Sequence, residues 1–113
     1  MHEYSIVQAL YESVMTHAIM RGAGTIQQVR VRLGELSGVD GGLLHTAWRT
    51  FRVRTPCAGA EMLIETIPPA WQCPACAQEA PSRGPRRCGT CGGPLHLVKG
   101  DEILLDQIVM EVP

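Results

Sequence analysis

Four of the five cysteines in this 113-residue chain form two Cys-x-x-Cys pairs, Cys73 with Cys76 and Cys88 with Cys91. Two intervening residues allow a single turn to present both sulfurs and to direct backbone N–H groups at them. Two such turns supply four thiolates, which is the ligand set that structural Zn²⁺ prefers. The spacing therefore predicts a four-cysteine metal site.

The ligand set limits which metal the site can hold and what role the metal can have. Four thiolates leave no coordination position open for water, so the pattern indicates structural rather than catalytic zinc. Iron in the same cage, as in a rubredoxin-like electron carrier, has the same ligand types. Zinc is favoured because most of the chain lies outside the cysteine stretch, in a domain that an electron carrier would not require. An iron–thiolate site would also absorb visible light.

A second group of metal-binding atoms lies at the N-terminus, in Met1, His2 and Glu3. Met1 should be retained, because methionine aminopeptidase requires a small second residue. The free amine and the His2 amide then close a five-membered chelate ring, and that amide with the imidazole Nδ1 closes a six-membered one. Nitrogen donors in a plane suit Ni²⁺ or Cu²⁺. Spacing alone indicates such a site only weakly, because a histidine at position two is common in solvated termini.

Charge and composition exclude several classes of protein. The net charge of −1 argues against a general polyanion binder, although Arg83, Arg86, Arg87 and Lys99 make the cysteine stretch locally basic. Sparse aromatic residues there favour a solvated loop over a nucleic-acid contact. No long apolar run or basic leader is present, so we expect no membrane span and a cytoplasmic location. There, paired cysteines indicate metal ligands rather than disulfides.

Periodicity places these groups on an α+β framework. Apolar residues at helical spacing predict a helix over 3–21, and a second helix that is capped by Asp40 and carries Leu43, Leu44, Ala47, Trp48 and Phe51. Alternating or β-branched segments predict strands over 25–36, 60–67 and 102–112. The arrangement implied is two helices on one face of a small three-stranded sheet.

The cysteine stretch interrupts this framework before the last strand. It is rich in cysteine, proline and glycine and poor in aliphatic residues. Trp71 and Gln72 before the first pair, and residues 94–98 after the second, are typical of zinc-ribbon strands; residues 77–87 between them need no further structure. We therefore expect one domain from residues 1–69 plus 100–113, and a zinc-ribbon domain from residues 70–99.

Three segments together resemble a known family. They are the start Met-His-Glu-Tyr-Ser-Ile, the run from Val29 to Gly38, and the four-cysteine ribbon. In this order they are similar to the HypA/HybF hydrogenase maturation proteins, which are nickel-delivery chaperones. The resemblance covers nearly the whole chain.

The resemblance implies a nickel metallochaperone for [NiFe]-hydrogenase. His2 matches the family's nickel ligand, with Glu3 and the Met1 amine in support, and Cys73, Cys76, Cys88 and Cys91 match its zinc ligands. Zn²⁺ would be structural and Ni²⁺ the transferred cargo. The implied partners are a HypB-type GTPase and the hydrogenase large subunit, and a homodimer stays open.

None of the remaining candidate residues indicates an enzyme. The chain has no catalytic triad, paired-carboxylate pattern or phosphate loop, so we expect no catalytic residue and no GTP hydrolysis by this chain. Cys57 is interpreted as a small buried or loop residue, His17 and His45 as structural or surface residues, and His96 as the outward residue of a strand. The alternatives are a zinc-ribbon module that binds nucleic acid or a protein assembly, and the rubredoxin-like electron carrier.

Overall fold

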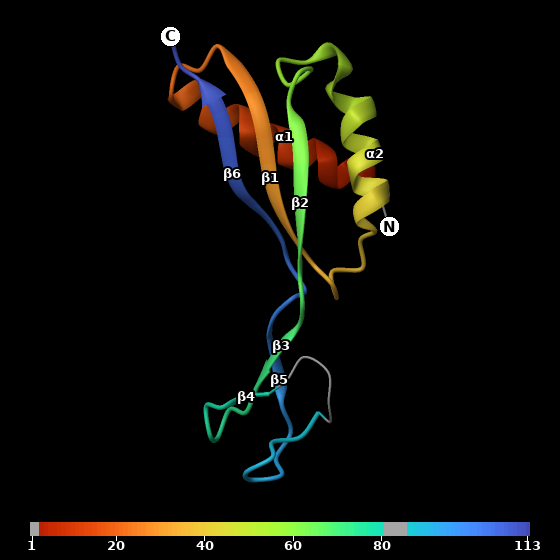
Figure 1. The fold of residues 1–113 in the computed structure, drawn as a ribbon, viewed down its shortest axis with the longest axis vertical. Coiled ribbons are helices and arrows are strands. Elements are labelled where there is room, and N and C mark those ends of the chain that lie inside the picture. Colours follow the sequence, from red (N-terminus) through yellow and green to blue (C-terminus); the bar gives the residue numbers. More distant parts are fainter. Residues whose placement is uncertain (1–2, 81–85) are drawn as a thin grey trace.

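The computed structural model of the chain describes residues 3–80 and 86–113, which form two helices, one 3₁₀ turn and six strands (Figure 1). In chain order these are α1 (Glu3–Met20), β1 (Thr25–Gly34), α2 (Gly41–Phe51), the 3₁₀ turn (Arg52–Arg54), β2 (Glu61–Ile67), β3 (Ala70–Gln72), β4 (Glu79–Ala80), β5 (His96–Lys99) and β6 (Ile103–Glu111). The predicted α+β class is confirmed. In the part of the chain that is described, no helix is long and apolar enough to cross a membrane.

Helix α1 buries one stripe and ends at a glycine. Its buried residues are Val7, Leu10, Val14 and Ala18, which recur every three or four positions as the sequence predicts. Gly22 has a φ of 64° and the Ala23 N–H bonds to the Ala18 carbonyl over 3.0 Å. Together with the Gly22 N–H bond to Ile19, this is a Schellman ending, which satisfies carbonyls that the helix itself leaves unpaired.

The main sheet has three strands in the order β2-β1-β6. β1 pairs with β2 in parallel and with β6 antiparallel, so β1 is the central strand. A parallel pair needs a long crossover, and α2 supplies it between β1 and β2. The inward residues of β1 are Val29, Val31 and Leu33, all less than 5% exposed, as the alternating pattern predicts.

Helix α2 begins where the sequence places its cap. The Asp40 side chain accepts a hydrogen bond from the Leu43 N–H over 2.9 Å, which satisfies one of the free donors of the first turn. Leu44 and Trp48 are fully buried. Leu43 was expected in the same apolar stripe but is 57% exposed, because helical spacing from Leu44 and Trp48 turns position 43 toward solvent.

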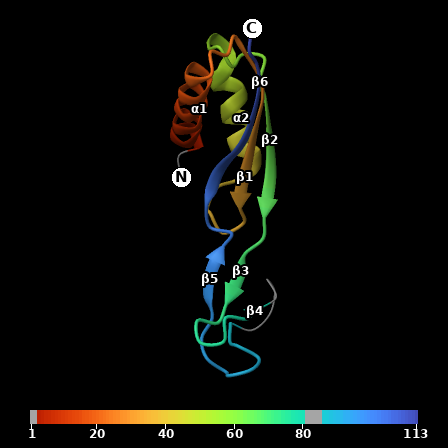
Figure 2. The ribbon, with the colours of Figure 1, turned by 90° about the vertical axis from the view of Figure 1, so that its left-hand side faces the viewer.

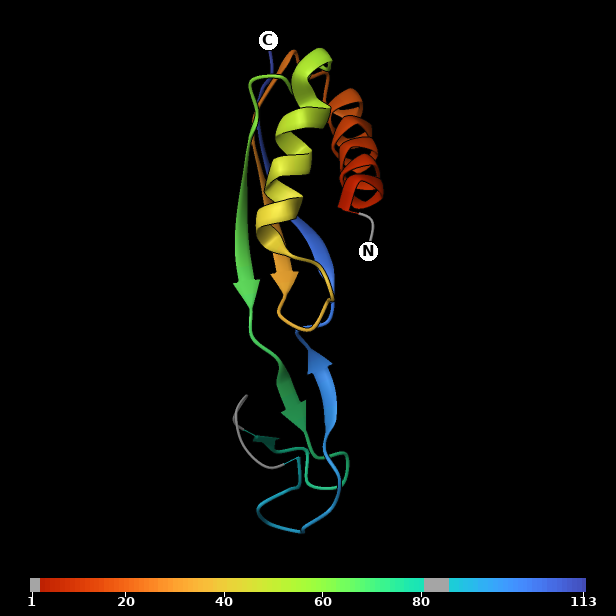
Figure 3. The ribbon, with the colours of Figure 1, turned by 90° about the vertical axis from the view of Figure 1, so that its right-hand side faces the viewer.

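Both helices lie on the same face of the main sheet (Figures 2 and 3). They enclose one core with the inward faces of β1, β2 and β6, and Trp48 crosses that core to donate from Nε1 to the Ala60 carbonyl over 2.9 Å. Among the described residues, no helix covers the opposite face of the sheet. The first helix is thereby held against a packed surface along its length.

A second sheet, in the order β4-β3-β5, carries the cysteines. β3 and β5 are the two strands expected beside the cysteine pairs. β4 was not expected: Glu79 and Ala80 pair with Gln72 and Trp71, so part of the spacer between the pairs has regular structure. Only the tertiary pairing reveals this strand, because two residues carry no periodic signal.

The two sheets are joined by a narrow junction. β2 continues into β3, and β5 continues into β6, so the second sheet extends from one end of the first and the molecule measures 55 × 27 × 16 Å. The turn after β1 closes the junction: the Leu36 N–H donates to Gly100 over 2.7 Å and the Glu35 N–H to Ile67 over 2.9 Å. The ribbon is therefore hydrogen-bonded to the end of the central strand.

Candidate metal centre

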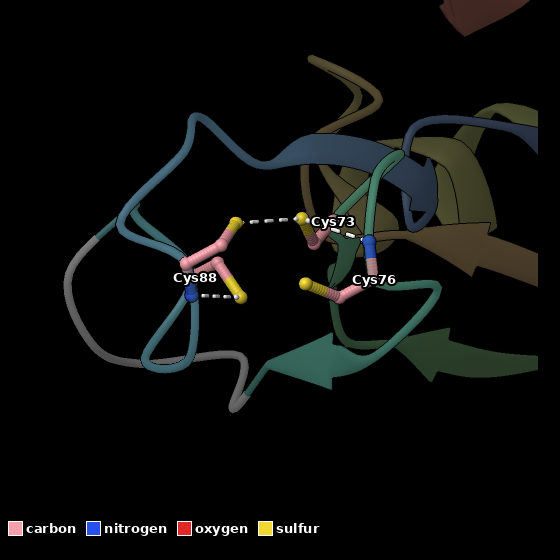
Figure 4. A group of neighbouring side chains, drawn as sticks. Cys73, Cys76 and Cys88 are labelled. Carbon is pink, nitrogen blue, oxygen red and sulfur yellow. Dashed lines mark hydrogen bonds between the residues drawn. The ribbon is translucent and has the colours of Figure 1, made fainter.

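The four paired cysteines converge at the far end of the ribbon (Figure 4). The ligand atoms of Cys73, Cys76, Cys88 and Cys91 all lie within 4.8 Å of one another. Cys73 directly follows β3, and the second pair precedes β5. In the described part of the chain, this is the group of histidine, cysteine and acidic side chains that can hold a metal ion.

The sulfur spacing fits a tetrahedral ion. Zn–S bonds of about 2.3 Å in a tetrahedron place neighbouring sulfurs about 3.8 Å apart. The Cys73 and Cys91 sulfurs are 3.6 Å apart, far longer than a disulfide bond of about 2.05 Å. All four cysteines are free thiols in the structure. The arrangement therefore fits a four-coordinate thiophilic cation and leaves no position for water.

Backbone N–H groups point at the sulfurs. Cys76 donates to the Cys73 sulfur over 3.4 Å, and Thr90 and Cys91 donate to the Cys88 sulfur over 3.4 and 3.5 Å. Gly93 donates to the Cys91 sulfur over 3.4 Å. These bonds favour thiolates over neutral thiols, so the two turns prepare the charged form that a metal requires.

The two turns have the same backbone geometry. The Ala77 N–H bonds to the Cys73 carbonyl and the Gly92 N–H to the Cys88 carbonyl, over 2.8 and 2.9 Å. Both donor residues have positive φ, 57° at Ala77 and 72° at Gly92. Thr90 and Gln78 also bond side chain to side chain over 2.8 Å, which links one turn to the other. The pairs are thus two copies of one ligand-presenting turn.

Two of the four thiols, Cys76 and Cys88, have pKa values shifted in opposite directions. Backbone hydrogen bonds from Cys91 and Thr90 lower the pKa of the Cys88 thiol from 9.0 to about 6. Hydrogen bonds with the Cys91, Cys73 and Cys88 side chains raise the pKa of Cys76 from 9.0 to about 12. One thiolate therefore forms readily near neutral pH while a neighbour retains its proton, and a cation in the cluster is needed to stabilise all four thiolates together.

The other candidate residues are placed apart from this cluster. Cys57 is fully buried in the main core, and its burial raises the pKa of its thiol to about 11. His96 is exposed on β5 and is not in the cysteine cluster, as expected for an outward strand residue. His17 is exposed on α1 and His45 is half-buried on α2. The interpretation of these residues as non-ligands is consistent with their positions.

Two of the four basic residues make contacts within the ribbon. The Arg86 guanidinium lies 4.0 Å from the centre of the Trp71 ring, a cation–π contact that sequence analysis missed. Arg87 donates to the Gly92 carbonyl over 3.3 Å. Arg83 lies outside the described residues. These contacts stabilise the ribbon, and they engage positively charged side chains that a nucleic-acid interface would use.

The predicted nickel ligands fall largely outside the described residues. Met1 and His2 are not among them, whereas Glu3 is half-buried and opens α1. The next residue, Tyr4, packs edge-on against Phe51 of α2 with ring centres 5.3 Å apart, and Tyr11 approaches the same ring to 5.2 Å. The first turn of α1 is therefore anchored to α2 immediately after the predicted nickel-binding residues.

Comparison with known proteins gives one consistent result. Residues 1–110 match the family described as HypA, hydrogenase/urease nickel incorporation, metallochaperone. Two similar proteins, both called hydrogenase maturation factor HypA, come from Wolinella succinogenes and Shewanella baltica, at 40% and 38% identity. Each alignment covers 98% of this chain, with 96% and 97% of the relative.

Solved structures agree along the full length. The solution structure of the Ni metallochaperone HypA from Helicobacter pylori superposes with a TM-score of 0.77 and 28% identity, covering 100% of both chains. A second solution structure, of a HypA protein, superposes with a TM-score of 0.83 and 28% identity, covering 100% of this chain and 98% of the other. The main sheet and the ribbon are therefore both shared with these proteins.

Proposed function

Because this chain belongs to the HypA family of nickel metallochaperones, we propose that its N-terminus binds Ni²⁺ as cargo while its cysteine cluster holds a structural Zn²⁺. The chain is a nickel metallochaperone of hydrogenase maturation. The family match carries this conclusion, because residues 1–110 include both predicted metal-binding segments. The cysteine cluster adds support, since its four sulfurs suit a permanently bound ion.

We assign the two metals to two domains. Residues 1–69 with 100–113 form the nickel-binding domain, and residues 70–99 form the zinc-ribbon domain with Cys73, Cys76, Cys88 and Cys91 as ligands. The separate sheets β2-β1-β6 and β4-β3-β5 support this division. The ribbon lacks an apolar core of its own, so a bound Zn²⁺ would supply its folding free energy.

The proposed nickel site consists of the Met1 amine, the His2 amide and imidazole, and Glu3 in support. Its nitrogen donors are harder than thiolates and leave room for a further ligand, which suits an ion that must be handed on. The amine and the imidazole must be deprotonated to bind. With reference pKa values of about 7.8 and 6.5, nickel affinity should fall as the pH drops through that range.

Nickel delivery requires partner proteins, but it does not require this chain to catalyse a reaction. We propose that it is not an enzyme, that it passes nickel on by ligand exchange with a HypB-type GTPase and the [NiFe]-hydrogenase large subunit, and that it works in the cytoplasm. The free thiols support a reducing compartment.

Replacement of His2 by alanine tests the proposal. We expect His2→Ala to abolish stoichiometric nickel binding, because it removes the imidazole and with it the six-membered chelate ring, while one zinc per chain and the fold are retained. Metal analysis after nickel loading, with circular dichroism, measures both. A matched variant with Gly-Ser-Gly added before Met1 keeps His2 and moves the amine out of the chelate, so its nickel affinity should also fall.

His17→Ala is the control, because this exposed histidine lies near the other end of α1. It should bind nickel as the wild type does. Unchanged nickel titrations in both the His2 variant and the extended variant would exclude the N-terminal site. Loss of nickel in the His17 variant alone would place the site elsewhere on the helix.

A further inference from the structure

A groove runs along the free edge of β6. It has a volume of about 650 Å³ and is lined by consecutive residues of β6, by Val112 after that strand, and by two residues at the end of the first helix. These two are His17, in the last turn of α1, and Arg21, which directly follows the helix. β6 pairs only with β1, so its other edge is open in the described part of the chain.

The edge retains its capacity to pair. β6 is nine residues long and contains no lysine or proline, the residues that commonly protect exposed edges. Its register with β1 is interrupted beside Asp106, but the residues after that point, 107–111, contain no insertion on the β6 side. The Glu111 carbonyl accepts from Gly24, so by alternation the backbone groups of Met110 point away from β1.

The groove has an apolar wall and a basic end. Leu105, Ile108 and Met110 face the helix side and are half-buried. Arg21 is exposed, and it forms no ion pair with any acidic group among the described residues. A segment seated in the groove would therefore meet apolar side chains along β6, and a cation near the carboxyl end of β6.

We propose that this groove binds an extended, apolar segment of another protein with one acidic residue, which adds a fourth strand to the sheet antiparallel to β6. The added strand would alternate apolar residues toward Ile108 and Met110, and would place a carboxylate near its start, against Arg21. Backbone pairing would supply the affinity. The apolar contacts and the ion pair with Arg21 would supply the specificity. The groove lies at the opposite end of α1 from Glu3 and on a different sheet from the one that carries the cysteines.

A second copy of this chain fits less well. The two acidic residues of β6 have partners of their own. Asp106 also lines the groove but lies 3.6 Å from Arg32, and Glu111 accepts from Gln27 over 3.2 Å. A paired β6 from another copy would thus offer no carboxylate to Arg21. Charge complementarity therefore favours a different polypeptide.

Two synthetic hexapeptides with blocked ends test the proposal by NMR titration of the ¹⁵N-labelled protein. One has the sequence Glu-Thr-Val-Thr-Val-Thr and the other begins with lysine instead. We expect the glutamate peptide to shift the amide signals of residues 107–112 and to bind more tightly than the lysine peptide. Arg21→Glu should weaken the glutamate peptide on the order of threefold, as for exposed ion pairs, and should reverse the preference.

Arg30→Glu is the matched control, because Arg30 is an exposed arginine on the helix-free face of the same sheet. Its affinity for both peptides should equal that of the wild type. Absence of shifts along β6 at millimolar peptide, or equal binding of the two peptides to wild type and Arg21→Glu, would overturn the proposal. Concentration-dependent shifts of the same amides without peptide would instead identify a second copy as the occupant.

Discussion

Ala77 and Gly92 occupy equivalent positions in the two cysteine turns, but only one of them is a glycine. Both have positive φ, 57° and 72°, and both donate to the carbonyl of the first cysteine of their pair. A positive φ costs a residue with a Cβ about 1–2 kcal/mol, whereas glycine adopts it freely. The first turn therefore contains backbone strain that the second turn does not.

This difference predicts opposite effects of two substitutions. Ala77→Gly should stabilise the zinc-loaded ribbon by roughly 0.5–1 kcal/mol, after the larger entropy of unfolded glycine is subtracted. Gly92→Ala should destabilise it by roughly 1–2 kcal/mol, and no atom lies within 4 Å of the added Cβ to complicate the effect. Competition with a chromophoric chelator measures zinc retention in each. A change of the same sign in both variants would contradict the conformational explanation.

Individual residues also show why some features could be predicted from the sequence and others could not. The cysteine pairs were recognised because metal ligation imposes a spacing that few other functions require. The strained Ala77 and the stacking of Arg86 on Trp71 were missed, because neither leaves a pattern in the sequence. His2 was singled out from chelate chemistry and family resemblance, and it stays a prediction because it lies outside the described residues.

At the scale of the elements, the ends of the helices have local physical causes. α1 ends in a Schellman motif at Gly22, and α2 begins at the Asp40 cap. Both ends lie close to where the sequence predicts them, since the first helix was expected to end at residue 21 and Asp40 to cap the second, and helix ends have local physical causes. β4 was not predicted, because its two residues gain structure only by pairing with β3.

Removal of the α2 cap tests this local account. Asp40→Ala should lower the free energy of unfolding by about 1 kcal/mol, because the Leu43 N–H loses its acceptor. Asp40→Asn keeps a side-chain oxygen and should unfold much as the wild type does. Urea denaturation followed by circular dichroism gives both values. Equal losses in the two variants would indicate that the carboxylate charge, rather than the cap, stabilises the helix.

At the scale of the whole molecule, the ribbon and the main sheet meet at two glycines. A Cβ on Gly34 would collide with the backbone of Gly100. Gly100 itself has a φ of 104°, and a Cβ there would lie 2.5 Å from the Cα of Pro69. The close approach of these chains fixes how the ribbon extends from the sheet.

A substitution at the junction should therefore be costly. We expect Gly100→Ala to lower stability by more than about 2 kcal/mol, because both the positive φ and the contact with Pro69 oppose it. Gly59→Ala is the matched control, since no atom lies within 4 Å of its added Cβ, and its effect should be within about 0.5 kcal/mol. Urea denaturation of both variants measures the difference. Similar stability of the two would argue against a tight junction.

Zinc removal should destabilise the ribbon sheet and leave the main sheet folded. In Cys73→Ser we expect zinc loss and rapid proteolysis within residues 70–99, because the ribbon lacks an apolar core of its own. The main sheet and its helices should persist, since their buried core includes no residue of the ribbon. Limited proteolysis with mass spectrometry locates the cuts, and circular dichroism follows the helices. A ribbon as resistant as the wild type would contradict a structural role for zinc.

The sequence by itself determined the class of fold, the extent of the first helix, the start of the second, the convergence of four cysteines and the family. Each of these depends on local spacing, on ligand chemistry or on motifs that a single chain displays directly. Tertiary structure alone decided the central position of β1, the pairing of β4, the burial of Cys57 and the open edge of β6. These features depend on which segments distant in the chain come together, and hydrophobic periodicity does not specify a partner.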